Sequence, residues 1–173
     1  MLEKIKNYFF RRLLKKNACN GKTGLLPLSE ISSAAVLMNV EDPEFEACKD
    51  VVIKYFKSKG IKCELYFLDF RKIERDELLL TSIQNTFIRK DLNILGLPSP
   101  EKLDKVVFKQ PCDLFFSLVR NEEYTNVYIS ACIEARFKIG CVSYEGNPYD
   151  MVVSADSMSQ SIKSAWQLLE KIV

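Results

Sequence analysis

Residues 33–70 read SAAVLMNV EDPEFEACKDVVIKYFKSKG IKCELYFLDF, which is a short apolar run, an amphipathic segment and a second apolar run. In the middle segment, Asp42 and Pro43 predict a helix N-cap and a first-turn proline, and Gly60 predicts the helix end. A strand, a helix and a second strand in this order are typical of a parallel-sheet unit. The helix prediction depends on apolar residues that recur at helical spacing, namely Phe45, Cys48, Val51, Val52, Tyr55 and Phe56.

Helix-like and strand-like segments continue to alternate after Phe70. This alternation predicts the α/β class, with three layers, a mostly parallel twisted sheet and helices on both faces, Rossmann-like in the loose sense. We expect a helix over 1–20, a connector over 17–32 and a single α/β domain over 33–173. Within the domain, the apolar patterns predict helices over 72–82, 101–108 and 123–135, strands over 86–88, 113–119, 137–141 and 150–153, and a last helix that turns Met158, Ile162, Ala165, Trp166, Leu169 and Val173 inward.

Composition and cysteine usage indicate an ordinary globular protein. A chain of 173 residues buries roughly 70% of its extended surface on folding, so one core needs no disulfide or metal. No segment approaches the ~20 apolar residues of a membrane-spanning helix. Without a signal peptide or a Cys-x-x-Cys pair, we expect a cytoplasmic protein with reduced, mostly buried thiols. The six cysteines are Cys19, Cys48, Cys63, Cys112, Cys132 and Cys141.

The charge is concentrated at the N-terminus. Residues 1–20 contain six Lys and Arg against one acidic residue, a net charge of +5, and since the whole chain carries +2 the remainder carries −3. Leu2, Ile5, Phe9 and Leu13 follow helical spacing, and Arg11, Arg12, Lys15 and Lys16 lie between and after them, so a basic amphipathic helix is predicted.

This helix has several interpretations. Packing on its own domain or in a homo-oligomer is favoured, because most amphipathic helices contribute to a core. Contact with an acidic protein partner or with an anionic membrane surface is the alternative. Nucleic acid is disfavoured as a partner, because the remaining chain is acidic and has no second basic stripe with interleaved aromatic residues.

Ligands of such sheets bind beyond the carboxyl ends of the strands, so the candidate ligand-binding residues are those expected at that edge. Acidic residues in the first loop would repel a phosphate, and they either cap the following helix or contribute to a cation or Mg²⁺ pocket. An amide at the end of the first strand is expected to brace its loop. Arg71 and Arg120 each end an apolar strand, which also fits charged strand ends without an anion site. The candidates are Asn39, Glu41, Asp42, Asp69, Arg120 and Glu122.

No complete catalytic, metal or nucleotide motif is present, and no cofactor is implied. The chain contains no histidine, which excludes Ser-His-Asp and Cys-His nucleophilic sites and histidine metal ligands. Gly21-Lys22-Thr23 imitates the end of a phosphate-binding loop, but Lys16 occupies the position of the leading glycine and a helix precedes it. Catalytic residues are therefore not assigned.

Four short segments after Ser33 form a recognisable set, Asp91-Leu-Asn-Ile-Leu-Gly96, Tyr128-Ile-Ser-Ala131, Ala135-Arg-Phe-Lys-Ile-Gly140 and Tyr149-Asp-Met151. Together they resemble recurring features of a family of small, cytoplasmic, bacterial α/β proteins of unknown function. The resemblance implies a cytoplasmic α/β domain of this length, with no established activity and no functional residues to transfer. Physically, Asp91 and Asn93 predict a turn held by side-chain hydrogen bonds, and Gly140 predicts a turn after a strand.

Two functional hypotheses follow. The first is a non-catalytic α/β module that associates through its basic N-terminal helix with itself, with an acidic partner or with a membrane surface. The alternative is a small-molecule or metal-dependent enzyme or binding protein that uses the carboxyl edge of the sheet.

Overall fold

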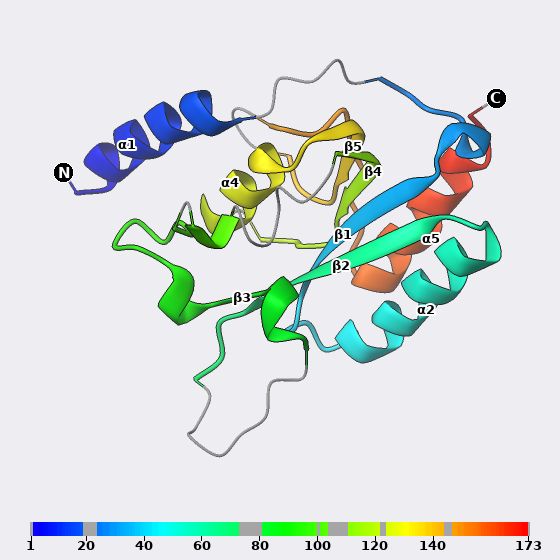
Figure 1. Ribbon diagram of the computed structural model, residues 1–173, viewed down its shortest axis with the longest axis horizontal. Helices are drawn as coiled ribbons and strands as arrows, with labels where there is room; N and C mark the ends of the chain where they lie inside the picture. Colours follow the sequence, from blue (N-terminus) through cyan, green and yellow to red (C-terminus); the bar gives the residue numbers. More distant parts are fainter. Residues whose placement is uncertain are drawn as a thin grey trace.

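The computed structural model describes residues 2–18, 24–72, 81–99, 101–103, 111–121, 124–143 and 147–172. Within these residues, six strands form one parallel sheet of order β3-β2-β1-β4-β5-β6 (Figure 1). The predicted three-layer α/β fold is confirmed. The strands are β1 (Ser33–Asn39), β2 (Lys62–Asp69), β3 (Thr86–Ile88), β4 (Cys112–Ser117), β5 (Ala135–Gly140) and β6 (Met151–Val152).

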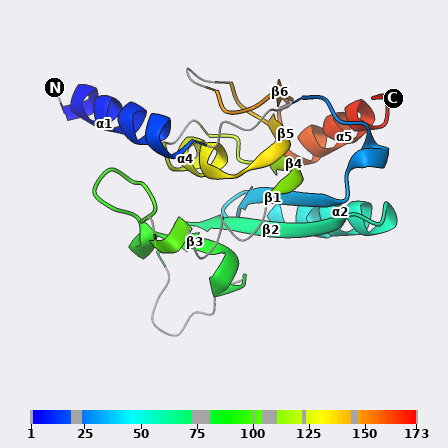
Figure 2. The ribbon, with the colours of Figure 1, turned by 45° about the horizontal axis from the view of Figure 1, so that its top comes forward.

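Helices cover both faces of the sheet (Figures 1 and 2). On one face, α2 (Phe45–Ser58) and α5 (Met158–Leu169) pack beside each other. On the other face, α4 (Tyr124–Cys132) packs on the sheet and α1 (Leu2–Asn17) packs on α4. Strand β1 separates two apolar cores, because its alternate side chains point to opposite faces: Val36 and Met38 belong to the α2–α5 core, and Leu37 belongs to the α4 core.

The start of α2 differs from the prediction. Asp42 and Pro43 lie in a turn before the helix, which begins at Phe45. The Asp42 side chain accepts a hydrogen bond from the Glu44 backbone N–H (3.0 Å), and its carbonyl accepts one from the Phe45 N–H (3.0 Å). Short acidic side chains favour such local turns in competition with helix, and this moves the N-cap from Asp42 to Glu44, a shift of two residues.

The predicted end of α2 is confirmed. Gly60 has φ +70°, in the left-handed region that glycine adopts without steric cost. The N–H of Gly60 donates to the carbonyl of Lys57 (3.1 Å) and the N–H of Ile61 to that of Phe56 (2.9 Å). This is the Schellman arrangement, and the buried Ile61 and Phe56 supply the apolar contact that accompanies it.

Other predicted elements are confirmed, some with the predicted bounds and some with shifted ones. The short strand over 86–88 is β3, and the last helix is α5. Gly140 is the last residue of β5, not part of a turn after the strand, and a Cβ there would lie 2.1 Å from the Tyr149 ring, so this position has no room for a side chain. Residues 101–103 are helical, whereas Cys19, Val173, 73–80 and 104–110 lie outside the described residues.

The basic helix α1 packs on its own domain through its second half. Phe10 is only 8% exposed, and its ring lies 4.8 Å from that of Tyr124 between ring centroids. The Tyr124 hydroxyl donates to the Asn7 side-chain carbonyl. Leu13 and Leu14 are half-buried against the α4 core. The side chains of Leu2, Ile5 and Phe9 are outside the description, whereas those of Arg11, Arg12, Lys15 and Lys16 are exposed.

Candidate functional site

The carboxyl edge of the sheet contains the position where ligands of this architecture bind. After β1 the chain enters α2 on one face, and after the neighbouring β4 it enters α4 on the other face. The two connections therefore diverge, and in open parallel sheets the crevice at such a point receives the ligand. Asn39 ends β1, and Arg120 lies just after β4. The sequence candidates are thus located at the relevant edge.

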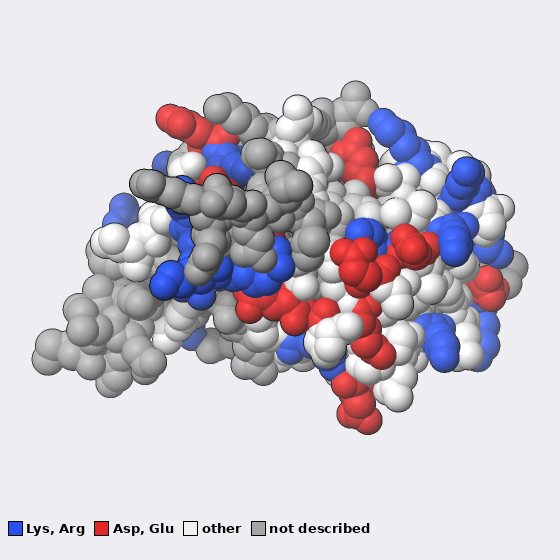
Figure 3. Space-filling model, turned by 90° about the horizontal axis from the view of Figure 1, so that it is seen from below, with Lys and Arg blue, Asp and Glu red and all other residues white. Residues whose placement is uncertain are grey.

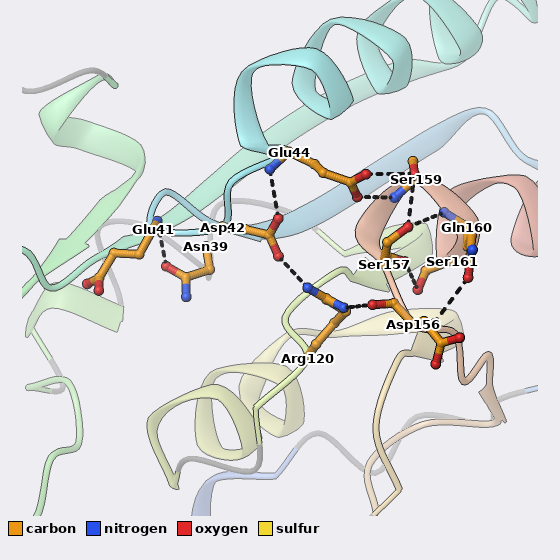
Figure 4. A network of polar contacts seen from close by, with 10 residues as sticks. All are labelled: Asn39, Glu41, Asp42, Glu44, Arg120, Asp156, Ser157, Ser159, Gln160 and Ser161. Carbon is orange, nitrogen blue, oxygen red and sulfur yellow. Dashed lines mark hydrogen bonds and ion pairs between the residues drawn. The ribbon is translucent and has the colours of Figure 1, made fainter.

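In this structure an ion pair joins the two loops at this expected ligand position. The Arg120 guanidinium lies 3.1 Å from the Asp42 carboxylate, between the loops that follow β4 and β1 (Figure 4). The same guanidinium donates to the backbone carbonyl of Asp156, in the loop before α5. Arg120 therefore joins three loops, and its hydrogen-bonding capacity is directed at the protein itself.

The N-terminus of α5 also receives an internal partner. The Glu44 carboxylate accepts hydrogen bonds from the backbone N–H (2.9 Å) and the hydroxyl (3.0 Å) of Ser159, and these lower the pKa of Glu44 (Figure 4). Ser157 caps the helix by accepting from the Gln160 N–H (3.2 Å). A helix N-terminus attracts anions through its free N–H groups. Here a carboxylate of the same chain already occupies that position.

The remaining candidates do not converge on one site. Asn39 accepts a hydrogen bond from the Glu41 N–H (3.0 Å), so its predicted bracing role is confirmed, while the Glu41 side chain is exposed. Asp69 is fully buried and pairs with Nε and Nη2 of Arg71, both at 2.8 Å. Glu122 lies outside the described residues. In the parts of the chain that are described, no group of three or more Cys, Asp or Glu is arranged to hold a metal ion.

An open depression of about 560 Å³ lies next to the loop and helix that Arg120 and Glu44 contact, since Asp156 and Gln160 line it. Its lining is polar, with Ser154, Asp156, Gln160 and Lys163 among its residues, and it runs along α5 as far as Gln167. Neither Asp42 nor Arg120 lines it, so the hollow lies beside the crevice and not inside it.

A buried polar network was not anticipated from the sequence. The hydroxyls of Ser117 and Ser130 donate to the Asn126 side-chain carbonyl (3.1 and 3.3 Å), and the Tyr149 hydroxyl donates to that of Ser130 (3.0 Å). The Lys138 ammonium donates to the backbone carbonyl of Ser130 (3.1 Å). Serine, lysine and tyrosine are the residue types of several catalytic sites, but all five side chains are buried. Four of them are hydrogen-bonded to one another, and Lys138 is bonded to backbone carbonyls.

This network explains three of the family-like segments. Residues 128–131, 135–140 and 149–151 lie on different elements and loops and meet around Ser130, Lys138 and Tyr149. A charged residue between apolar residues of a strand was the available signal, and Lys138, between Phe137 and Ile139 of β5, is the clearest case. Its role in the described structure is to connect β5 with the end of α4.

None of the described cysteines forms a disulfide, and four of them are unsuited to nucleophilic chemistry. Burial is the main cause that raises the pKa of Cys48 and Cys141 to about 11 and that of Cys63 and Cys112 to about 12. Since the thiolate is the reactive form, these side chains are protonated and inert near neutral pH.

Among the described helices, none is both long enough and apolar enough to cross a membrane. No curated protein and no solved structure matches the chain. The resemblance to a family of unknown function is confirmed, because the family described as "Family of unknown function (DUF6913)" matches residues 3–172. With nearly its whole length covered by this match, the chain belongs to the family of unknown function DUF6913.

Proposed function

We propose that the protein is a non-catalytic α/β module of the cytoplasm, which associates with an anionic partner through the basic side of α1. The observation that carries this proposal is the division of α1 into two sides. Phe10 is buried against α4, whereas Arg11, Arg12, Lys15 and Lys16 are exposed.

The packing of α1 narrows the choice of partner. The described part of the apolar side is used within the chain, because Phe10, Leu13 and Leu14 contact the α4 core. The side that faces solvent is cationic, and two copies of a cationic surface repel each other. An anionic partner has the complementary charge, so the proposal favours it over a homo-oligomer.

The carboxyl edge gives less support to the alternative, a small-molecule or metal-dependent protein. Arg120 is paired with Asp42, and Glu44 is bonded to the first turn of α5. A ligand at this crevice would have to replace these internal partners. The cytoplasmic location is proposed because the described cysteines form no disulfide, and oxidising compartments favour disulfides.

The test uses the full chain and poly-glutamate as a defined anionic probe. The variant Arg11→Gln, Arg12→Gln, Lys15→Gln, Lys16→Gln should bind poly-glutamate at least about tenfold more weakly at low salt, because each surface charge pair contributes on the order of 1 kcal/mol. The matched control replaces four exposed lysines of α2 and the C-terminal segment with glutamine, at Lys54, Lys57, Lys163 and Lys171. Both variants lose the same charge, so a difference between them locates the binding surface.

Fluorescence anisotropy with labelled poly-glutamate measures the affinities at low and at high salt. The proposal requires that the wild-type chain and the control bind alike and that the α1 variant binds more weakly. Equal affinities for all three proteins, or equal loss in both variants, would refute it.

A further inference from the structure

The turn over residues 91–97 presents a large apolar side chain to solvent. Ile94 is 94% exposed at this turn. The Asn93 side chain accepts hydrogen bonds from the backbone N–H groups of Leu95 (2.8 Å) and Leu97 (3.2 Å), and Gly96 takes φ +76°. The turn predicted at Asp91 and Asn93 is thus confirmed. Its backbone conformation is fixed by local bonds that leave Ile94 without a role in the core.

The same turn is anchored next to α1. Thr125 in the first turn of α4 donates its hydroxyl hydrogen to the Gly96 carbonyl, and the preceding residue, Tyr124, contacts Phe10 and Asn7 of α1. Tyr124 and Thr125, which are adjacent in α4, therefore hold α1 and the turn over residues 91–97, respectively. Figures 1 and 2 show α1 and this turn at the same end of the molecule, away from α5.

The exposed charge near Ile94 is positive. Arg89 and Lys90 immediately precede the turn and are exposed. The nearest acid in the sequence, Asp91, accepts from the Ile88 N–H (2.9 Å) and pairs with Lys102 (3.1 Å). Figure 3 shows basic side chains gathered on the part of the lower face that lies under β3 and the 3-10 turn Arg89–Asp91, beside a group of acidic ones.

Resting on the proposed function, we infer that the anionic partner is the surface of a phospholipid membrane, with the cations of α1 at the headgroups and Ile94 inserted between them. An anionic bilayer provides negative headgroups and, about 5–10 Å deeper, hydrocarbon for an aliphatic side chain. An acidic protein segment or a nucleic acid offers the charge without the hydrocarbon. One inserted side chain and a basic helix give reversible peripheral binding, which requires no spanning helix.

The test compares vesicles of phosphatidylcholine alone with vesicles of phosphatidylcholine and phosphatidylserine in equal parts. Wild-type protein should co-sediment with the anionic vesicles only. Ile94→Ser should weaken that binding about tenfold, the loss expected when one buried aliphatic side chain is removed. The matched control is Val51→Ser, since Val51 is a 49% exposed branched aliphatic residue of α2, which covers the other face.

A second measurement reports insertion directly. Ile94→Trp should show a blue shift and stronger emission on adding anionic vesicles, whereas Val51→Trp should show neither. The native Trp166 stacks on Tyr55 at 4.0 Å in the α2–α5 core and gives a constant background.

The outcomes separate this inference from the proposed function. If Ile94→Ser binds anionic vesicles as tightly as wild type and Ile94→Trp shows no shift, the inference of membrane insertion is wrong. The proposed function would still be supported in that case if the α1 variant binds poly-glutamate more weakly than wild type. If the α1 variant and the wild type bind both probes equally, both proposals fail. Loss of vesicle binding in Ile94→Ser with unchanged poly-glutamate binding supports the membrane surface.

Discussion

Asp113 shows how one carboxylate fixes the register of two strands. It lies near the start of β4, and its Oδ2 accepts hydrogen bonds from the backbone N–H and the hydroxyl of both Ser32 and Ser33, at 2.8–3.1 Å. Burial raises the pKa of Asp113, but the hydrogen bonds from Ser32 and Ser33 outweigh burial and lower it to about 2. These contacts connect the amino ends of β1 and β4, the two central strands of the sheet.

We expect Asp113→Asn to lower the free energy of unfolding by about 1–2 kcal/mol at neutral pH, because an amide accepts fewer and weaker hydrogen bonds than a carboxylate. The pKa of Asp113 in the folded state lies below the unfolded value of about 3.9. The contribution of its charge is therefore fully present above about pH 4 and is lost as the pH falls through about 2.

Urea unfolding of wild type and Asp113→Asn at neutral pH and near pH 3 measures this dependence. The difference between the two proteins should shrink at the lower pH. Asp50→Asn, at an exposed position of α2, serves as the control and should change little at either pH. A difference that does not vary with pH would contradict the assignment.

Glu44 connects two helices that are distant in the chain. It precedes α2, and its carboxylate accepts hydrogen bonds from Ser159 in the first turn of α5. Since the first N–H groups of a helix have no partner within the helix, we expect Glu44→Ala to accelerate hydrogen exchange at the Ser159 amide and its neighbours. The control is Glu46→Ala, which removes only an ion pair with Lys49 inside α2. Unchanged exchange at Ser159 would show that this contact does not protect α5.

The elements themselves were largely predictable because their signals are local. The apolar run at 33–40 and the left-handed Gly60 mark β1 and the end of α2 without reference to the rest of the chain. The start of α2 was mispredicted because Asp42 forms a turn that competes with helix. The role of Glu44 depends on a residue 115 positions away, so no local pattern contains it.

The candidate site could not be predicted without the order of the strands in the sheet, and no local sequence pattern determines that order. Asp42 and Arg120 were both named as edge residues, and they meet because β1 and β4 are neighbours in the sheet. The same adjacency turns them into partners of each other instead of ligands for a third group. The network of Ser130, Lys138 and Tyr149 was missed for the same reason, since it exists only once β5 lies against α4.

At the scale of the whole molecule, the relevant property is whether α1 unfolds together with the sheet. If it does, the cations of α1 have a fixed position relative to the rest of the surface. Phe10→Ala removes a buried ring from the contact with Tyr124, and we expect the free energy of unfolding to fall by about 3 kcal/mol. Arg12→Ala, at an exposed position of the same helix, should change it by less than about 0.5 kcal/mol.

Urea unfolding followed by Trp166 fluorescence reports on the α2–α5 core, on the far side of the sheet from α1. A loss of stability seen by this probe in Phe10→Ala means that α1 unfolds together with the sheet. In that case the cations of α1 and the turn over 91–97 keep a fixed spacing, because both are held by the first turn of α4. If Trp166 reports the same stability for Phe10→Ala as for wild type, α1 docks independently and the two features do not form one rigid surface.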